Sequence, residues 1–257
     1  MKIAVCLYGQ PRDYDKGYEN INNFIQGQLN KTHTFDFFIH CWGDDNVRME
    51  CSPWRNIDKH TLVIRDHRKV RQDILNYYHP LNYTFEKPIT RFDLSEITNS
   101  LAYQNTHNSM KKQNIHNTLS QMYSRNKVKN ILQDYIAQHD DAAAYDMVMN
   151  IRIDYQAPIH FQLEADMDKT KTYVSRMYFP RYIIPDNFIL CPLHVYLTWF
   201  GLYDHLSDII NNREIDGLMK KLKEVLEFNM EEMILSNYLL HFDIKDVVYD
   251  PSIKSAF

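Results

Sequence analysis

Residues 2–42 combine a buried strand, an amphipathic helix and a second strand, and this order restricts the fold more than any other feature of the chain. The run from Lys2 to Tyr8 is mostly apolar and ends at Gly9, as is typical of a strand buried on both faces. Gly17 to Leu29 has the spacing of an amphipathic helix, and "TFDFFIHCW" at Thr34 to Trp42 is a second apolar run. Together they predict a βαβ unit, which requires a parallel sheet with helices packed on its faces.

The remaining segments continue this alternation and predict a single α/β domain with a largely helical C-terminal section. Asn82 to Ser100 has no clear assignment, and the strongly polar stretch Asn105 to Asn117 is interpreted as a loop. Only six glycines are present, which leaves no glycine-rich phosphate loop of the kinase-like or dehydrogenase-like kind. The further predicted elements are strands at 61–66, 147–155, 172–178 and 187–192 and helices at 69–78, 118–139, 193–210, 218–228 and 230–241.

Charge and cysteine content argue against several classes of protein. A net charge of -4 does not suit a nucleic-acid-binding surface, because counterion release needs clustered Lys and Arg. The first apolar run is too short for a signal peptide, and no run approaches the ~18 residues of a membrane span, so we expect a cytoplasmic protein without a transmembrane segment. The four cysteines form no CxxC pair and are interpreted as reduced core residues: Cys6, Cys41, Cys51 and Cys191.

The stretch "MVMNIRIDY" at Met147 to Tyr155 is an apolar strand with polar residues at alternate positions. Because successive side chains of a strand point to opposite faces, Asn150, Arg152 and Asp154 share one face and the methionines and isoleucines share the other. Two interpretations remain open. Arg152 and Asp154 pair with each other or line a sheet edge, or Asp154 lies at the carboxyl end of the strand and holds Mg²⁺ or Mn²⁺ against a diphosphate.

The first strand ends in a second polar segment, "LYGQPRDY". Gly9 allows close approach of the backbone to a ligand, and Pro11 stiffens the turn. Gln10 and Arg12 offer hydrogen-bond donors at the carboxyl end of the strand. An ordinary turn from strand to helix also uses Gly and Pro, but the planar fork of Arg12 favours a phosphate or carboxylate ligand.

Several motifs in this order resemble those of GT-A-type glycosyltransferase-like proteins of large DNA viruses, phages and bacterial surface-polysaccharide loci. Each motif has low to moderate specificity, and the resemblance lies in their order and spacing over most of the chain. The motifs are "GQPR" at 9–12, "FFIHCW" at 37–42, "SQMYS" at 120–124, "YDMVMNIRID" at 145–154, "DNF" at 186–188, and Glu232, Leu235, Tyr238 and Leu239 in the pattern ExxLxxYL.

The resemblance implies a single GT-A-like domain over residues 1–257 that transfers a sugar from a nucleotide-diphosphate sugar to a glycan or another hydroxyl acceptor. Residues 1–156 would form the nucleotide-binding half and 157–257 the acceptor side. The loop of Gly9, Gln10 and Arg12 would line the nucleotide site, and Asp154 would stand where such enzymes keep a metal-binding DxD motif. The activity would belong to polysaccharide synthesis, in the host cytoplasm if the protein is viral.

This chain departs from the DxD pattern, because Arg152 occupies the first acidic position. Dependence on Mn²⁺ or Mg²⁺ is therefore an open question. Arg152 can offset the charge of a diphosphate directly, which would leave Asp154 as the one carboxylate on the metal or as an acceptor for a sugar hydroxyl.

Two further pairs of residues lie at the end of the second strand or just after it. His40 and Trp42 share a face of that strand and match the family's "HxW", although a core histidine beside a packing tryptophan gives the same pattern. Asp44 and Asp45 can supply a pair of metal ligands, but Gly-Asp-Asp is also an ordinary turn, which we favour.

An inverting transfer also needs a base that deprotonates the acceptor hydroxyl. Asp186, just before a predicted strand on the acceptor side, is the first candidate, and the alternative is a turn residue after Pro185. Glu232 is the second candidate, but its spacing from Asn229 is that of a helix capping box.

Two other functions remain possible. The missing first acid is compatible with a non-catalytic GT-A-like module that binds a glycan or a nucleotide. An enzyme that acts on another nucleotide-activated group would use the same phosphate chemistry and release a different product.

Overall fold

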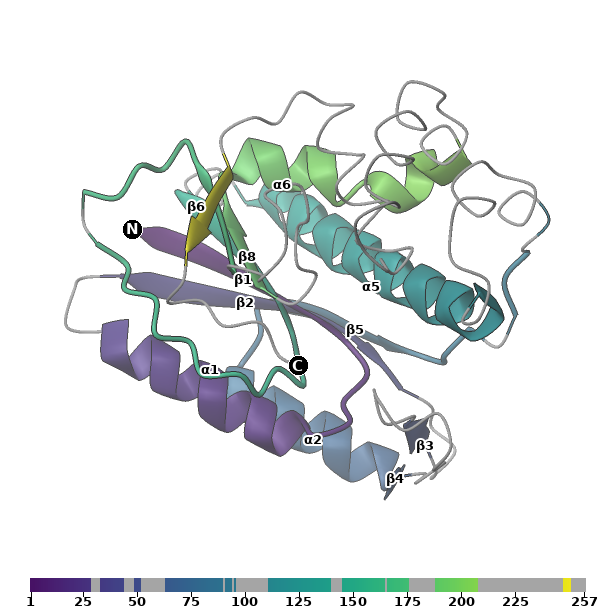
Figure 1. The fold of residues 1–257 in the computed structure, drawn as a ribbon. Coiled ribbons are helices and arrows are strands. Elements are labelled where there is room, and N and C mark those ends of the chain that lie inside the picture. The colour runs from purple at the N-terminus through teal and green to yellow at the C-terminus, as the bar shows by residue number, and fades with distance from the viewer. Residues whose placement is uncertain are drawn as a thin grey trace.

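The structure is a computed structural model, and it describes residues 1–28, 33–43, 49–51, 63–89, 91–93, 95, 111–139, 145–164, 166–175, 188–207 and 247–250. Within these residues a seven-stranded sheet is flanked by helices on both faces (Figure 1). The strands are β1 (Lys2–Gly9), β2 (Thr34–Trp42), β3 (Met49–Cys51), β4 (Val63–Arg65), β5 (Asn82–Glu86), β6 (Met147–Arg152), β7 (Thr172–Ser175), β8 (Phe188–Cys191) and β9 (Val247–Asp250). The helices are α1 (Tyr14–Gln28), α2 (His67–Tyr78), α5 (Lys111–Gln138), α6 (Leu193–Trp199) and the 3₁₀ helix η4 (Leu202–His205).

The sheet has the order β5-β2-β1-β6-β8-β7-β9 and is mainly parallel, as predicted. Strands β5, β2, β1 and β6 are mutually parallel, whereas β8 is antiparallel to both β6 and β7, and β9 is parallel to β7. Among the described strands of this sheet, β8 alone is reversed. The first strand is therefore a central one, and Ile3 to Tyr8 are fully buried because β2 and β6 flank β1 and helices cover both of its faces.

Each face of the sheet has its own core. Helices α5 and α6 cover one face, and α1 and α2 cover the other (Figure 1). On β6 the predicted alternation is confirmed: Met147, Met149 and Ile151 belong to the core beneath α1 and α2, while Val148 belongs to the core beneath α5. The polar side chains of β6 therefore share the face that α5 and α6 cover.

Several predicted boundaries were wrong. Helix α1 begins at Tyr14 instead of Gly17, and β6 ends at Arg152 instead of Tyr155, so Asp154 lies in the turn after the strand. Helix α5 begins at Lys111, inside the stretch that was interpreted as a loop, because "KKQNIHN" is polar but contains no Gly or Pro and includes good helix formers. Helix α6 ends at Trp199 instead of continuing to residue 210, and a 3₁₀ turn follows Gly201. The predicted helices at 218–228 and 230–241 lie outside the described residues.

The third strand of the parallel sheet is β5, which lies in the segment without an assignment. The strand predicted at 61–66 is observed as β4, which pairs with β3 in a separate two-stranded sheet. Cys6, Cys41 and Cys191 are buried free thiols, as predicted. In the part of the chain that the structure describes, no helix has the length and apolar character needed to cross a bilayer.

Candidate functional site

The carboxyl ends of four parallel strands lie side by side, and polar residues gather along this carboxyl-terminal edge of the sheet. β1 ends at Gly9, β2 at Trp42, β5 at Glu86 and β6 at Arg152, and the parallel registers bring these ends together. The backbone N–H of Ile153 donates to the carbonyl of Tyr8 over 3.0 Å, which joins the turn after β6 to the end of β1. Open α/β sheets bind their ligands at the carboxyl ends of the strands, so this edge is the candidate site.

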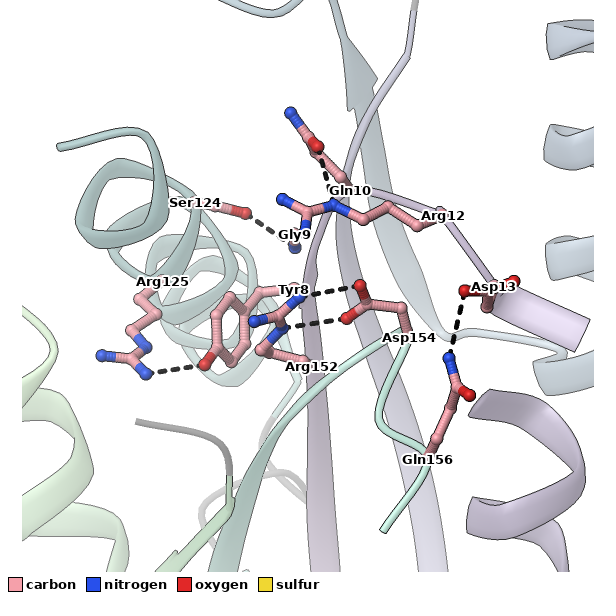
Figure 2. Close-up of polar contacts among 10 residues, drawn as sticks. All are labelled: Tyr8, Gly9, Gln10, Arg12, Asp13, Ser124, Arg125, Arg152, Asp154 and Gln156. Atoms are coloured by element: carbon pink, nitrogen blue, oxygen red, sulfur yellow. Dashed lines mark hydrogen bonds and ion pairs between the residues drawn. The ribbon is translucent and has the colours of Figure 1, made fainter. Parts of the chain in front are cut away.

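The loop after β1 has a backbone that favours glycine at its first position. Gly9 has a φ of 106°, a conformation that L side chains rarely adopt. The Nε of Arg12 donates to Oε1 of Gln10 over 3.0 Å, and the Arg12 amide donates to the Gln10 carbonyl over 3.0 Å (Figure 2). The two predicted donors are thus fixed against each other, half-buried, beside the end of β1.

Arg152 and Asp154 pair with each other, which is the first of the two interpretations of "MVMNIRIDY". Nε and Nη2 of Arg152 donate to Oδ1 and Oδ2 of Asp154 over 2.9 and 2.7 Å (Figure 2). Only 15% and 7% of the two side chains are exposed. Helix α1 packs closely against the turn that carries them, because a Cβ on Gly17 would run into the carbonyl oxygen of Ile153. A bidentate, charge-assisted pair is therefore built into the edge of the sheet.

The described residues do not fit a divalent cation. Both carboxylate oxygens of Asp154 accept hydrogen bonds from Arg152, and the positive charge of this guanidinium disfavours a cation beside the same carboxylate. No group of three or more His, Cys, Asp or Glu side chains that could hold a metal occurs within the described residues. Asp44 and Asp45 lie outside them. Metal binding by Asp154 remains a prediction.

A chain of hydrogen bonds links the Gly9 loop to three other elements. The Gly9 N–H donates to Oγ of Ser124 on α5 over 3.0 Å, and that Oγ lies 2.7 Å from Nδ1 of His40 on β2. Nε2 of His40 lies 2.7 Å from Oε1 of Glu86, at the end of β5. Ser124 and His40 are fully buried, whereas 29% of the Glu86 side chain is exposed. The link therefore runs from the start of the loop through the interior to the rim of the site.

The pKa shifts in this chain follow from burial and hydrogen bonding. Burial lowers the pKa of His40, and the hydrogen bond with Glu86 opposes this effect only in part. The hydrogen bond with His40 lowers the pKa of Glu86. The His40 ring also packs edge-on against Trp42, with centroids 5.0 Å apart. His40 is thus the core histidine of one interpretation, with both ring nitrogens engaged by polar partners.

A buried arginine lies behind the site and was missed in the sequence. Arg125 on α5 is 2% exposed, and its Nη2 donates to the Tyr8 hydroxyl over 2.6 Å (Figure 2). Nearby on β6, Oδ1 of buried Asn150 accepts from the Tyr196 hydroxyl over 3.4 Å. "SQMYS" ends one residue before Arg125, but nothing in that motif predicts a buried charge.

The two candidate bases, Asp186 and Glu232, lie outside the described residues. The structure does describe the start of β8, where Phe188 pairs with Ile151 near the end of β6. The chain therefore enters β8 at the edge where Arg152 and Asp154 lie. Asp186 is two positions before Phe188 in the sequence, and its role as a base remains a prediction.

Comparison with known proteins gave no match, either to a protein-family model or to a curated protein. The functional interpretation consequently depends on the geometry of the site and on the resemblance of its motifs. Both concern the same segments, because "GQPR", "FFIHCW", "SQMYS" and the end of β6 all contribute to the edge described above.

Proposed function

We propose that this chain is a GT-A-type glycosyltransferase that moves a sugar from a nucleotide-diphosphate sugar to a hydroxyl of a glycan or another acceptor. The observation that supports it is the meeting of motifs that are far apart in the sequence. The Gly9 amide, Ser124 and His40 are joined by hydrogen bonds, although the last two are 84 positions apart. The resemblance depended on the order of the motifs in the sequence, and residues from three of them, Gly9, His40 and Ser124, contact one another near the carboxyl end of β1.

The topology is compatible with this proposal. A mainly parallel sheet covered by helices on both faces has its ligand edge at the carboxyl ends of its strands. The reversed strand, β8, begins at that edge, where Phe188 pairs with Ile151 near the end of β6. The acceptor half can in this way contribute residues to a site that the first half builds.

The chemistry of the site suits a diphosphate leaving group. Arg12 and Arg152 present guanidinium groups, which match phosphate oxygens and stabilise the negative charge that develops on departure. Gly9 has no side chain, so the backbone can approach the ligand closely. A bound Mn²⁺ or Mg²⁺ would supply further charge neutralisation, but the described residues do not fit it and no step is assigned to it. Asp186, and after it Glu232, remain the proposed bases.

The test is thermal unfolding of the purified protein with UDP, GDP, CMP, dTDP and their common sugars, each with Mn²⁺ and with EDTA. A ligand at about a hundred times its Kd stabilises the folded state by roughly 2.7 kcal/mol, which raises Tm by on the order of 5–10 °C at this size. A shift with one nucleotide supports the proposal and identifies the donor class. The absence of a shift with every nucleotide would refute it.

The site assignment has its own control. The double variant Arg12→Ala, Asp154→Asn should lose the nucleotide-induced shift in Tm. It removes the Arg12 guanidinium, a hydrogen-bond donor to phosphate, and it disturbs Arg152. Arg68→Ala, Asp134→Asn makes the same chemical changes at exposed positions on α2 and α5 and should keep the shift. Normal binding by the first variant would refute the assignment of the site.

A non-catalytic binding module is the second candidate, and the Arg152–Asp154 pair in place of two acids favours it. The two candidates differ in turnover. Release of the nucleoside diphosphate from a donor sugar by the purified protein excludes the binding module, and release of a non-sugar product would indicate a different nucleotide-activated substrate.

A further inference from the structure

The hydrogen-bonded chain of Glu86, His40 and Ser124 has no part in the chemistry proposed above. Two of these residues, His40 and Ser124, are fully buried, so neither can contact a substrate. Ser124 instead accepts a hydrogen bond from the Gly9 amide, at the start of the loop that is proposed to receive the nucleotide (Figure 2), and His40 contacts Ser124. The question is what this buried connection does for the loop.

The direction of each hydrogen bond follows from the one donor that cannot change. The Gly9 N–H donates, so Oγ of Ser124 is an acceptor in that bond. The hydroxyl hydrogen of Ser124 then points to Nδ1 of His40 if that nitrogen carries no hydrogen. Nε2 must in that case carry the hydrogen of the neutral ring, and it donates to Glu86.

This arrangement matches a neutral His40 and an ionised Glu86. A proton added to His40 places hydrogens on both ring nitrogens, so the Ser124 hydroxyl loses the acceptor on which its orientation depends. The disturbance reaches Gly9 directly, because Gly9 donates to the same oxygen. Gly9 has a φ of 106°, and a glycine backbone without this anchor has more conformational freedom than any other residue.

We infer that Ser124, His40 and Glu86 are positioning residues that hold the Gly9–Arg12 loop in its nucleotide-binding conformation, and that a proton on His40 weakens donor binding by disrupting this hold. The inference rests on the proposed function for the identity of the ligand. The coupling between His40 and Gly9 does not depend on any ligand.

The charged groups around His40 act in opposite directions. Glu86, from β5, favours the imidazolium, and Lys127, from α5, opposes it. Tyr123, also from α5, has its ring centroid 6.1 Å from that of His40. On β1 the residue paired with His40 is Tyr8. Burial is the largest influence and favours the neutral ring at neutral pH.

The first part of the experiment follows the Gly9 amide and the His40 ring by NMR, from pH 7.5 to the lowest pH at which the protein stays folded. The chemical shift of the Gly9 amide should change over the same pH range in which the His40 ring takes up its proton. His40→Gln should abolish this change, because glutamine can still donate to Glu86 but does not titrate. Glu86→Gln should move the midpoint to lower pH, because it removes a charge that favours the imidazolium. The control is His139→Gln, which should change nothing, because His139 is exposed and directly follows the end of α5, about 20 Å from Ser124 by the helix rise.

The second part measures the Kd of the nucleotide identified by thermal unfolding. Ser124→Ala should raise Kd about tenfold at pH 7.5, the effect of one lost hydrogen bond. The wild-type Kd should rise as His40 becomes protonated, and the Kd of His40→Gln should stay flat over the same range.

The outcomes separate this inference from the proposed function. A Gly9 shift that stays flat while His40 titrates, or a His40→Gln variant with the wild-type pH dependence of Kd, overturns the inference, as does a His40 that stays neutral until the protein unfolds. A wild-type protein whose Gly9 amide follows His40 but which binds no nucleotide refutes the proposed function and the donor part of the inference, and leaves the coupling established.

Discussion

Removal of one member of the Arg152–Asp154 pair should destabilise the protein far more than removal of one member of an exposed ion pair. The two side chains are 15% and 7% exposed and share two short hydrogen bonds. Loss of one partner of a buried pair costs about 3–5 kcal/mol, because the other charge stays buried. The pair lies at the edge of the sheet and keeps some solvent contact, so we expect Asp154→Ala to cost roughly 2–3 kcal/mol.

A double-mutant cycle isolates the contribution of the pair. Replacement of both partners by apolar residues often restores stability, because no buried charge remains. Arg152→Met with Asp154→Ala should therefore cost less than the sum of the single changes, by about 1.5 kcal/mol or more. Urea unfolding at pH 7 measures each free energy, and an unchanged m value confirms that the same surface is exposed on unfolding.

The matched control is the exposed pair Lys171 and Asp168, with side chains 43% and 45% exposed and a separation of 3.6 Å. Its coupling should not exceed about 0.5 kcal/mol. If the buried pair shows a coupling as small as this control, or if Asp154→Ala costs less than about 0.5 kcal/mol, the reasoning from burial and geometry is refuted.

Three further predictions follow from other parts of the structure. Gly17→Ala should cost on the order of 2 kcal/mol in a thermal unfolding assay, because its Cβ would meet backbone, whereas Gly27→Ala in the same helix meets nothing and should stabilise by roughly 0.5–1 kcal/mol. The lowered pKa values of His40 and Glu86 mean that the unfolded chain takes up protons at higher pH than the folded one. Unfolding free energy, measured with urea at several pH values, should accordingly fall as pH decreases below 6.5 and again below 4.5, and His40→Gln should remove the first decrease. If the Arg152–Asp154 ion pair also forms in solution, it should keep a metal ion off Asp154, and nucleotide binding should persist in EDTA. Calorimetry measures the Kd, and a tenfold rise in Kd on chelation would contradict this.

The elements that the sequence predicts well have a periodic pattern of their own. The alternation of "MVMNIRIDY" has the period of a strand, and its two faces are found in the two cores. The start of α5 was missed because polar residues give no periodicity to a solvated helix turn. Strand β5 was missed because "NYTFE" is short and no residue of it is fully buried.

The candidate site was predictable only in its separate pieces. The polar residues at the ends of β1 and β6 follow apolar runs, so the sequence indicates them. The contact of His40 with Glu86 joins positions 46 apart, and that of His40 with Ser124 joins positions 84 apart. Such contacts depend on strand order and on the path of α5 across the sheet, and no local pattern encodes either. Ser124 appeared within "SQMYS" but gave no sign of its partners.

The central position of β1 has a consequence for how the chain folds during synthesis. β1 pairs on one side with β2, which follows soon after it, but on the other side with β6, and the Lys2 amide bonds the carboxylate of Asp146, 144 positions later. At ribosomal rates of about 5–20 residues per second, the edge of β1 waits on the order of ten seconds for its second partner. Ile3, Val5 and Leu7 give β1 apolar side chains, so the nascent chain exposes an apolar strand with one unpaired edge for this time. We therefore expect the yield of folded protein to depend on chaperones that bind such segments, and slow translation before β6 to increase aggregation.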